Sequence, residues 1–260
     1  MVVQMSGSEP TAQPAESLSR WAANPWAFLT EAGKVNDPPP GQGVIPFQAW
    51  PHLLRLLWLI EGNRLTIVLK ARQLGVTWVL AGLSLWQALF HEGAKVLLLS
   101  KGQTEAQDML ARCRLMWREL PDWARPTLGS DQAHLLTIPV MDSSIRALPA
   151  TEDAGRTETA TLVVCDEWDY HPYAEANYAA VKPTIDAGGQ FVGVSTSNRL
   201  VVDSFFKRIW RGAPGNGFKT MFLPWFSRPG RDETWYAGRE REYDPFVLEQ
   251  EYPSTEAQAL

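Results

Sequence analysis

A short segment near residue 70 combines cations, a glycine and a hydroxyl at spacings that could hold phosphate groups. The segment follows an apolar run at 66–69 and precedes a helical pattern that starts near residue 76. It reads Lys70-Ala71-Arg72-Gln73-Leu74-Gly75-Val76-Thr77. A strand, a loop and then a helix form the arrangement in which backbone amides at a helix N-terminus cradle phosphates. The sequence therefore predicts a phosphate-binding loop made of all eight residues.

The loop departs from the usual pattern in the position of its lysine. Gly75 and Thr77 stand at the usual spacing. Val76, however, occupies the usual place of the lysine, and Lys70 occupies the place of the first glycine. Because lysine has a four-carbon side chain, the Lys70 ammonium could reach across the phosphates, and Arg72 would add a second, forked donor. The plainer alternative is a strand-to-helix turn with two solvent-facing cations.

Two acidic residues end a second apolar run. Residues 162–165 read Leu-Val-Val-Cys, and Asp166 and Glu167 follow directly. A carboxylate at the carboxyl end of a parallel strand can hold Mg²⁺, and a neighbouring carboxylate can orient and deprotonate an attacking water. We therefore expect Thr77 and Asp166 to bind Mg²⁺. We expect Glu167 to be the catalytic residue that activates water for nucleotide hydrolysis.

The elements that would position these residues alternate between strands and helices. Apolar runs and 3.6-residue periodicity predict, in chain order, helix 53–60, strand 66–69, helix 76–90, strand 95–99, helix 103–120, a hairpin of strands 134–138 and 144–148, strand 161–165, helix 173–185, strand 190–195, helix 203–211, strand 219–223 and helix 232–242. Such alternation implies right-handed crossovers and a doubly wound, mainly parallel sheet with helices on both faces. Together with the loop, it predicts an α/β P-loop NTPase fold of the RecA-like, ASCE type.

The N-terminal residues lack this alternation. Residues 1 to about 20 are polar and are expected to form a flexible end. A short helix is expected at 21–32, and the proline- and glycine-rich stretch 37–43 is expected to be a linker. The ordered core should therefore start near Ile45.

Bulk composition limits the function classes. The chain has 260 residues, a net charge of -5 and a sequence pI near 5.5, which argue against a protein that wraps nucleic acid with its whole surface. It has two cysteines without metal-ligand spacing, no apolar stretch typical of a membrane span and no secretory signal, so a reduced, cytosolic setting is expected. The length fits one main active site. The expected division is an N-terminal extension over 1–44, the P-loop core over 45–215 and a lid or linker subdomain over 216–260.

The loop and the acid pair together resemble the large terminase subunits of tailed bacteriophages. In that family the loop commonly carries an Arg-Gln pair before the glycine, here Arg72 and Gln73, and variants with the lysine at the start of the loop occur. Phe47 and Gln48, with Trp50 nearby, resemble the family's adenine-recognising segment. A glutamine amide can pair with both donor and acceptor edges of adenine while an aromatic ring stacks on the base.

A third segment resembles the family's coupling motif, which senses the γ-phosphate. Residues 193–198 read Gly-Val-Ser-Thr-Ser-Asn, so Ser195, Thr196 and Asn198 are expected near the nucleotide. Ser197 stands where many members have proline. An ordinary turn is the alternative explanation for this segment. The resemblance as a whole covers about residues 45 to 255.

The resemblance also implies an arginine that acts on a neighbouring subunit's nucleotide. Arg156, in Ala-Gly-Arg before the acidic strand, is the first candidate for this arginine finger, and Arg146 is the second. A solvated loop cation is the alternative for Arg156. On this interpretation Arg72 contributes to catalysis and to phosphate binding.

The activity implied by the resemblance is Mg²⁺-dependent ATP hydrolysis that drives double-stranded DNA, independent of its sequence, into a viral procapsid. The implied partners are the portal protein, the small terminase subunit and further copies in a homo-oligomeric ring, a pentamer, with a monomer expected in isolation. The implied location is the host cytoplasm, with docking on the procapsid. Residues 249–257 resemble the connection to a nuclease domain, which this sequence does not contain, so nuclease activity is not expected.

A basic helix is the candidate DNA contact. Lys101, Arg112, Arg114 and Arg118 would bind the phosphate backbone, although spaced cations on a helix are usually a solvated face. Two other functions stay open at this point. One is a different DNA-dependent ATPase, such as a helicase or translocase. The other is a nucleotide-binding scaffold that does not hydrolyse, since Val76 replaces the usual lysine.

Overall fold

The computed structural model describes residues 12–37, 41–149, 151–156 and 159–260. The helices are α1 (Ala12–Ala23), α2 (Pro25–Ala32), α3 (Pro51–Glu61), α4 (Val76–Phe90), α5 (Gln103–Arg118), α6 (Ala174–Asp186), α7 (Phe205–Gly212), α8 (Glu233–Glu242), α9 (Pro245–Glu251) and α10 (Glu256–Ala259). The strands are β1 (Lys34–Asp37), β2 (Gly43–Pro46), β3 (Leu65–Lys70), β4 (Lys95–Leu99), β5 (Asp131–Gln132), β6 (Leu135–Ile138), β7 (Ser143–Ala147), β8 (Leu162–Asp166), β9 (Gln190–Ser195) and β10 (Lys219–Leu223).

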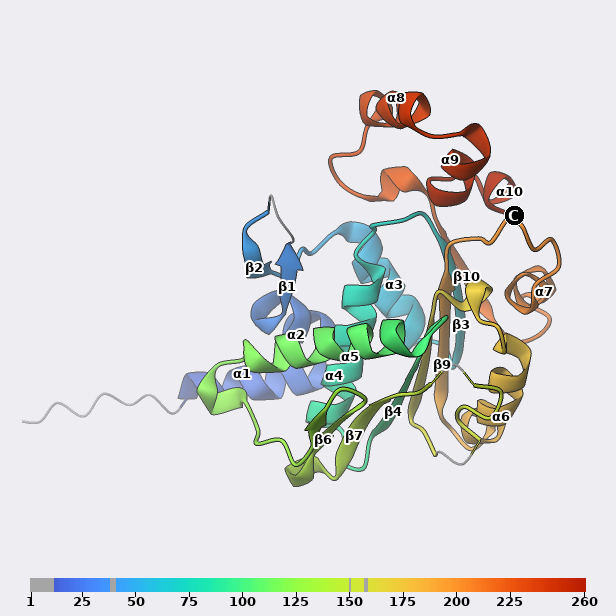
Figure 1. Cartoon of the computed structure of the whole chain (residues 1–260). Helices are drawn as coiled ribbons and strands as arrows, with labels where there is room; N and C mark the ends of the chain where they lie inside the picture. Colours follow the sequence, from blue (N-terminus) through green and yellow to red (C-terminus); the bar gives the residue numbers. More distant parts are fainter. Residues whose placement is uncertain (1–11, 38–40, 150, 157–158) are drawn as a thin grey trace, which may run out of the picture.

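One sheet organises most of these elements. Its strand order is β10-β3-β9-β8-β4-β7-β6-β5 (Figure 1). The strands from β10 to β7 are parallel, whereas β6 and β5 pair antiparallel at one edge. Leu136 lies opposite Ile145, which confirms the predicted hairpin. The predicted doubly wound, mainly parallel fold is confirmed.

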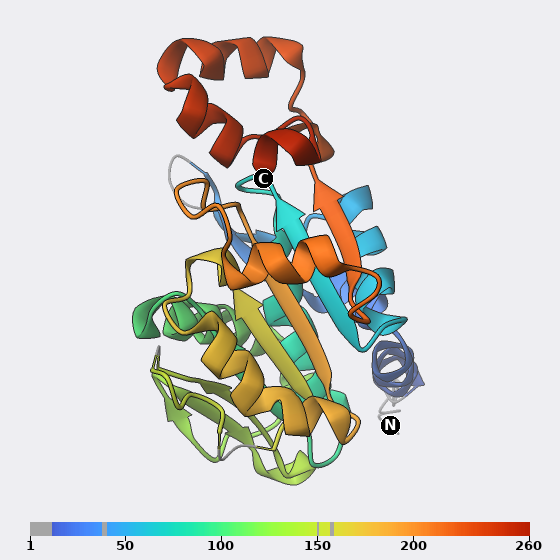
Figure 2. The ribbon, with the colours of Figure 1, turned by 90° about the vertical axis from the view of Figure 1, so that its right-hand side faces the viewer.

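The strands divide the interior into two cores. In β3, Val68 packs in the core that contains α2 to α5, whereas Ile67 and Leu69 pack in the core that contains α6 and α7. Figures 1 and 2 show these two sets of helices on opposite faces of the sheet. Because the central strands are buried on both faces, their sequences are continuous apolar runs instead of alternating ones.

The N-terminal segment is a helix from residue 12, so the predicted flexible end of about 20 residues is too long. Helix α1 places Trp21, with 4% of its surface exposed, against the rings of Phe28 and Trp123. Trp86 Nε1 also donates a hydrogen bond to the Trp21 carbonyl oxygen, at 2.6 Å. Burial of this large aromatic ring therefore anchors α1 to the rest of the fold. Residues 1–11 lie outside the described part.

The predicted linker 37–43 joins a pair of strands. Val35 lies opposite Ile45 in an antiparallel pairing of β1 with β2, and residues 38–40 between the strands lie outside the described part. Phe28 and Leu29 of α2 are fully buried. The ordered core thus begins well before the predicted start near Ile45, because the apolar face of α2 packs into the main core.

The C-terminal segment, defined here as residues 224–260, lies above the carboxyl edge of the sheet (Figures 1 and 2). Strand β10, which the predicted subdomain 216–260 included, pairs with β3 and so belongs to the main sheet. Trp225 stacks on Trp235 and Tyr236 of α8, and these ring contacts hold α8 against the start of the C-terminal segment. Helices α9 and α10 were not predicted, since helices of seven and four residues leave little periodic signal.

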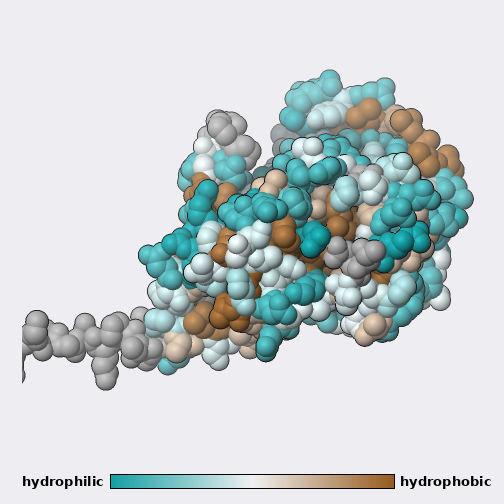
Figure 3. All heavy atoms as spheres, turned by 60° about the horizontal axis from the view of Figure 1, so that its bottom comes forward, coloured by the Kyte–Doolittle hydropathy of each residue, from teal (hydrophilic) through white to brown (hydrophobic). Residues whose placement is uncertain are grey.

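Surface and cysteine features agree with an ordinary globular chain. Figure 3 shows a largely hydrophilic face on which apolar residues form scattered patches. Within the described ranges, no helix combines the length and apolar character needed to cross a membrane. Cys113 and Cys165 are buried and unpaired, and burial raises the pKa of the Cys113 thiol to about 12. Neither thiol is therefore placed for nucleophilic chemistry.

Candidate active site

The loop between β3 and α4 has the backbone form of an anion-binding turn. Gln73 and Gly75 have φ angles of 59° and 75°, in the left-handed region. Left-handed residues among right-handed ones create concavities lined by backbone amides. A Cβ at Gly75 would also lie 3.2 Å from the Trp50 ring. Gly75 is therefore required both by its φ angle and by the ring behind it.

Lys70 ends β3 and points into the site. Only 5% of its surface is exposed, and it lines the cavity beside the loop. Its Nζ lies 3.5 Å from Glu167 Oε1. The ammonium therefore lies between the loop and the acid pair. In this place it can supply the positive charge that Val76, at the usual lysine position, does not provide. Contact of Lys70 with a phosphate stays a prediction.

Thr77 and Asp166 meet across the site. Thr77 Oγ1 donates a hydrogen bond of 2.8 Å to Asp166 Oδ2. Asp166 ends β8, two strands away from the strand that carries the loop, and the backbone N–H of Glu167 donates to its Oδ1. Burial raises the pKa of Asp166, and the nearby Lys70 ammonium opposes this effect. Thr77 and Asp166 are 89 residues apart in the sequence and were predicted to bind the same metal ion. Their side chains meet in the structure.

Glu167 lies directly after β8 in a strained conformation. Its φ and ψ are 54° and 39°, in the left-handed region that non-glycine residues rarely adopt. Thr196 Oγ1 lies 3.4 Å from Glu167 Oε2, and Lys70 contacts the other carboxylate oxygen. Left-handed backbone at a non-glycine residue costs roughly 1–3 kcal/mol and is common at functional sites. The turn aims this carboxylate toward Lys70 and the loop.

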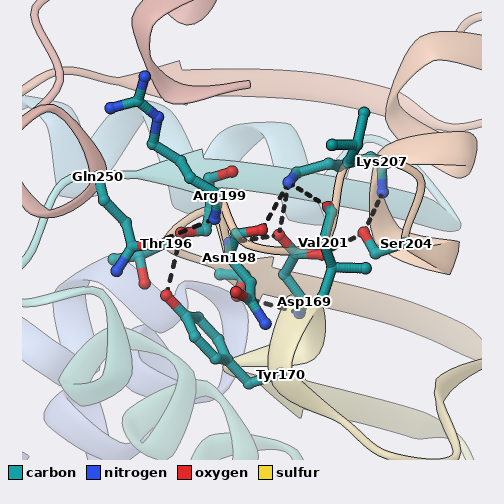
Figure 4. Close-up of polar contacts among 12 residues, drawn as sticks. Asp169, Tyr170, Thr196, Asn198, Arg199, Val201, Ser204, Lys207 and Gln250 are labelled. Carbon is teal, nitrogen blue, oxygen red and sulfur yellow. Dashed lines mark hydrogen bonds and ion pairs between the residues drawn. The ribbon is translucent and has the colours of Figure 1, made fainter. Parts of the chain in front are cut away.

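The predicted coupling segment lies beside the acid pair and is fixed by Asp169. Ser195 Oγ accepts a hydrogen bond of 3.0 Å from the Asp169 N–H, and the Asn198 N–H donates to Asp169 Oδ2 at 2.6 Å. Tyr170 Oη donates to the Ser197 carbonyl oxygen at 2.9 Å. The segment after β9 is therefore tied to the turn after β8, as Figure 4 shows.

A buried ion pair completes this connection. Lys207 of α7 and Asp169 have fully buried side chains, with Nζ 3.7 Å from Oδ2. Lys207 Nζ also donates hydrogen bonds of 2.7 Å to the carbonyl oxygens of Asn198 and Val201 (Figure 4). Ser204 donates to the second Asp169 oxygen. Buried charges need such complete partnering, so this network fixes the conformation of the segment that follows Thr196.

Two cavities adjoin at the loop. The larger, about 690 Å³, is lined by Val35, Asn36, Asp37, Ile45, Gln48, Trp50, Lys70, Gln73, Leu74, Gly75, Val76, Thr77, Trp78, Arg112 and Arg228. The smaller, about 230 Å³, is lined by Arg72, Thr77, Ser100, Lys101, Glu105, Asp108, Arg112, Asp166, Glu167 and Tyr170. Thr77 and Arg112 border both cavities. The larger cavity is of a size that could take a small-molecule ligand, and Asp166 and Glu167 line the smaller cavity beside it.

Solved structures with this arrangement of elements exist, although no protein-family model matches the sequence. The large terminase ATPase domain of Thermus phage P74-26 is 16% identical, with a TM-score of 0.59 over 73% of this chain and 87% of that chain. The large terminase of bacteriophage HK97 is 16% identical, with a TM-score of 0.62 over 92% and 50%. The chain has the large-terminase ATPase fold.

A third structure with this fold was solved with a nucleotide. It is the large terminase of a thermophilic bacteriophage in complex with ATP-gamma-S, 11% identical, with a TM-score of 0.59 over 76% of this chain and 51% of that chain. The present chain therefore spans about half the length of this terminase and of the HK97 large terminase. At these identities the likeness establishes the terminase ATPase fold, and the function has to be argued from the site.

The residues predicted to recognise the base lie in different places, some at the larger cavity and one in the core. Gln48 and Trp50 line the larger cavity. Phe47 is 6% exposed and packs edge-on against Trp26 in the core, so it does not line the cavity, and its predicted contact with a base is not supported. The guanidinium of Arg228 lies 4.9 Å from the centre of the Trp50 ring. The sequence did not indicate Arg228, because it lies far from Trp50 along the chain, in the C-terminal segment.

Arg72 turns away from the loop that it belongs to. Its side chain is 54% exposed and forms an ion pair with Glu251 of α9, although it also borders the smaller cavity. The Arg72 N–H donates to the Glu251 carbonyl oxygen at 2.9 Å. A direct role of Arg72 on the phosphates would require release of Glu251 and stays a prediction.

Neither candidate for the arginine finger lies in the two cavities at the loop of its own chain. Arg156 is exposed and pairs with Asp153 at 2.8 Å. Arg146 lines a separate cavity of about 470 Å³ beside β4 and β7, together with Lys95 and Asp142. An exposed position is required of a residue that reaches a neighbouring copy, so the position of Arg156 agrees with that hypothesis without testing it.

The predicted basic cluster on α5 does not form one surface. Arg114 pairs with Asp131, Arg118 with Glu119 and Lys101 with Glu105. Arg112 instead stacks on Trp78, 5.5 Å from the ring centre, and faces both cavities. The four cations therefore point to different partners, and a common DNA-binding role remains untested.

One further arginine grips the loop from the C-terminal segment. Arg231 donates hydrogen bonds to the Arg72 carbonyl oxygen at 2.9 Å and to Gln73 Oε1 at 3.1 Å. Its guanidinium contacts the rings of both Trp235 and Tyr252, at 4.4 and 5.3 Å from their centres. Burial lowers the pKa of Arg231 to about 10. Its only sequence signal is an arginine followed by an aromatic-rich helix, which does not identify the loop as its target.

Proposed function

We propose that the chain is an ATP-hydrolysing motor domain that moves double-stranded DNA into a viral procapsid. The observation that carries this proposal is the convergence of Lys70, Thr77, Asp166 and Glu167 at one end of the phosphate loop. The four residues come from three different elements and supply a cation, a hydroxyl and two carboxylates. P-loop enzymes that transfer a phosphoryl group to water combine groups of these kinds at a helix N-terminus.

The residues present fit a magnesium ion. Thr77 Oγ1 and Asp166 Oδ2 lie 2.8 Å apart at the loop, and Mg²⁺ prefers oxygen ligands with few protein contacts. Among the described residues no cluster of three or more acids, histidines or cysteines that could hold a metal occurs, which is compatible with an ion held mainly by phosphates and waters. When bound, Mg²⁺ would neutralise charge on the β- and γ-phosphates. Thr77 and Asp166 are the residues that would hold it.

Each remaining residue has a role that its geometry supports. Lys70 would leave Glu167 and bind the β- and γ-phosphates, where it replaces the charge missing at Val76. Glu167, released from that ion pair, would accept a proton from the attacking water. Thr196 contacts the same carboxylate, so loss of the γ-phosphate would be sensed at the segment tied to Asp169.

The larger cavity supports adenine recognition at its other end. Gln48 supplies an amide, and Trp50 and Arg228, which stack on each other, are flat groups beside which a base could pack. The Gln48 side chain donates to the Pro46 carbonyl oxygen at 2.9 Å, which fixes the direction of its amide. We infer that the base lies on the Trp50 side and the phosphates on the Lys70 side.

The DNA-packaging part of the proposal rests on the terminase fold and on the exposed Arg156. Ring assembly as a pentamer, binding of the portal protein and the small terminase subunit, and location in the host cytoplasm on the procapsid belong to the same proposal. The alternatives are a different DNA translocase and a nucleotide-binding scaffold. The scaffold is favoured only by Val76, and Lys70 supplies the charge that Val76 lacks.

The test is steady-state phosphate release with Mg·ATP, measured over a range of protein concentrations with and without duplex DNA. The wild-type chain should release phosphate, and Lys70→Ala should lower the rate by about 100-fold or more, since it removes the cation at the reacting phosphates. Lys182→Ala, in which an exposed lysine of α6 is removed, is the matched control. Phosphate release by Lys70→Ala at the wild-type rate, or no release by the wild type under any condition, would reject hydrolysis at this site.

A further inference from the structure

Most cations at the two cavities are already neutralised by acids. The ion pairs are Lys70–Glu167, Arg72–Glu251 and Lys101–Glu105. Two arginines that line these cavities lack an acid partner among the described residues, Arg112 and Arg228. Arg228 donates to the Gln73 carbonyl oxygen at 3.1 Å and borders only the larger cavity. Arg112 is the one that borders both cavities.

The position of Arg112 is fixed by a ring and not by a charge. Its guanidinium lies 5.5 Å from the centre of the ring of Trp78, which directly follows Thr77 in α4. Asp108 lies one helical turn before Arg112 on α5 and lines the smaller cavity, but within the described ranges no ion pair joins the two side chains. Arg112 is half-buried, so an acid or an anion beside it would be attracted more strongly than at an open surface.

The two cavities meet where the last phosphate of a bound nucleotide would lie. Lys70 and Gly75 line the larger cavity, Asp166 and Glu167 line the smaller one, and Thr77 borders both. A triphosphate laid along the loop would pass from the first set of residues to the second. A cation that borders both cavities therefore faces the terminal phosphate rather than the base or the ribose.

We propose that Arg112 binds the terminal phosphate of ATP from α5, as a cation supplied by the same chain that supplies the loop. This inference rests on the proposed nucleotide-hydrolase function and adds a recognition residue to it. Arginine suits the role because its planar fork can donate two hydrogen bonds to phosphate oxygens while one face stays stacked on Trp78. Arg112 would then distinguish ATP from ADP, and its assignment as a DNA contact is replaced.

The experiment compares equilibrium affinities for Mg·ATP-gamma-S and Mg·ADP by calorimetry in the wild type, Arg112→Ala and Arg112→Lys. Arg112→Ala should weaken ATP-gamma-S binding about tenfold or more and change ADP binding less than about threefold, since a charge-assisted hydrogen bond to phosphate is lost only for the triphosphate. Arg112→Lys keeps the positive charge but not the forked guanidinium, so its affinity for ATP-gamma-S should lie between those of the wild type and Arg112→Ala. Circular dichroism melting confirms that each variant is folded.

The matched control is Arg208→Ala. Arg208 stacks on Phe205 at the same 5.5 Å distance but pairs with Glu175 on the other face of the sheet, so both affinities should stay at wild-type values. Equal losses for ATP-gamma-S and ADP, or no loss for either, would overturn the inference while leaving the proposed function intact. Wild-type protein that binds neither nucleotide would overturn both. Loss of duplex DNA binding with unchanged nucleotide affinities would restore the DNA-contact role and reject the phosphate role.

Discussion

Glu167 is held in its left-handed conformation by groups on both sides of its carboxylate. Lys70 contacts one oxygen and Thr196 the other, and the backbone N–H of Glu167 donates to Asp166. Such a conformation persists only where the surroundings determine it, because a relaxed backbone would be lower in energy. The carboxylate is therefore preset for one direction, toward the end of the phosphate loop.

Removal of this carboxylate should separate binding from turnover. Glu167→Ala should lower kcat for ATP by about 100-fold or more, the usual scale for a lost general base, while the Kd for Mg·ATP-gamma-S changes little. Phosphate release and calorimetry measure the two quantities. Turnover near the wild-type value would remove Glu167 from the role of base, whatever the affinity.

His171 makes the fold sensitive to mild acid. Its Nε2 lies 2.8 Å from the Asp166 carbonyl oxygen, and burial lowers its pKa to about 4 from the usual 6.5. Below pH 6.5 the His171 imidazole becomes protonated in the unfolded chain, whereas in the folded chain it becomes protonated only near pH 4. The free energy of unfolding should therefore fall as pH drops through this window, with His171 contributing up to about 3 kcal/mol.

Urea unfolding at about pH 7.5, 5.5 and 4.5 measures this contribution. His171→Asn lacks the titrating ring, so its free energy of unfolding should fall less steeply across the window below pH 6.5 than that of the wild type. The prediction concerns the difference between the two slopes, since other acidic groups titrate in both proteins. Parallel slopes would mean that the ring is protonated in the folded state as easily as in the unfolded one.

At the scale of elements, the phosphate loop is held by the C-terminal segment as much as by its own strand and helix. The Arg72 N–H donates to the Glu251 carbonyl oxygen at 2.9 Å, and Arg228 donates to the Gln73 carbonyl oxygen at 3.1 Å. Arg231 adds two hydrogen bonds to the loop. Movement of the C-terminal segment would therefore change the loop, and a change in the loop would move the segment.

Arg231→Ala should loosen the loop. The change removes two hydrogen bonds and a guanidinium packed against two rings, so it should destabilise the fold by about 2 kcal/mol and speed amide exchange at residues 71–75. Hydrogen exchange read by mass spectrometry checks the second effect. Arg239→Ala is the matched control, because Arg239 also stacks on Trp235 but pairs with Glu242 and not with the loop. Loop exchange that is the same in both variants would contradict the link.

The sequence predicted the elements that carry the clearest periodicity. The parallel sheet, the hairpin of β6 and β7, and the strand ends that carry Lys70 and Asp166 were predicted, because continuous apolar runs and 3.6-residue patterns record burial directly. Helix α1 and strands β1 and β2 were missed. These elements are held in place by single contacts, such as the burial of the Trp21 ring in the core. Single contacts leave no periodic signal in the sequence.

The site was predictable to the extent that its residues lie in contiguous motifs. Thr77 and Asp166 are joined by a hydrogen bond, as expected from their places at the carboxyl edge of one parallel sheet. Arg228, Arg231 and Lys207 were not predicted, because their partners lie far away in sequence or are backbone oxygens. Local sequence carries no record of such long-range contacts, which only the packed structure reveals.

At the scale of the whole molecule, the proposed role of Arg156 as an arginine finger would require an active unit that contains more than one copy. Arg156→Ala and Glu167→Ala should each have low activity alone, because each lacks one half of a shared site. A mixture of the two should regain phosphate release above the sum of the separate rates, since some interfaces would combine an intact Glu167 with an intact Arg156. A mixture that only averages the separate rates would contradict transfer of the arginine between copies.

The central claim, that Lys70 supplies the charge absent at Val76, is tested most directly by a crystal structure of the chain with Mg·ATP-gamma-S. The account predicts Lys70 Nζ within about 3 Å of a β- or γ-phosphate oxygen, with Thr77 and Asp166 at the metal and Glu167 facing the terminal phosphorus. A nucleotide bound with Lys70 still paired to Glu167, or with both acids remote from the phosphates, would contradict it.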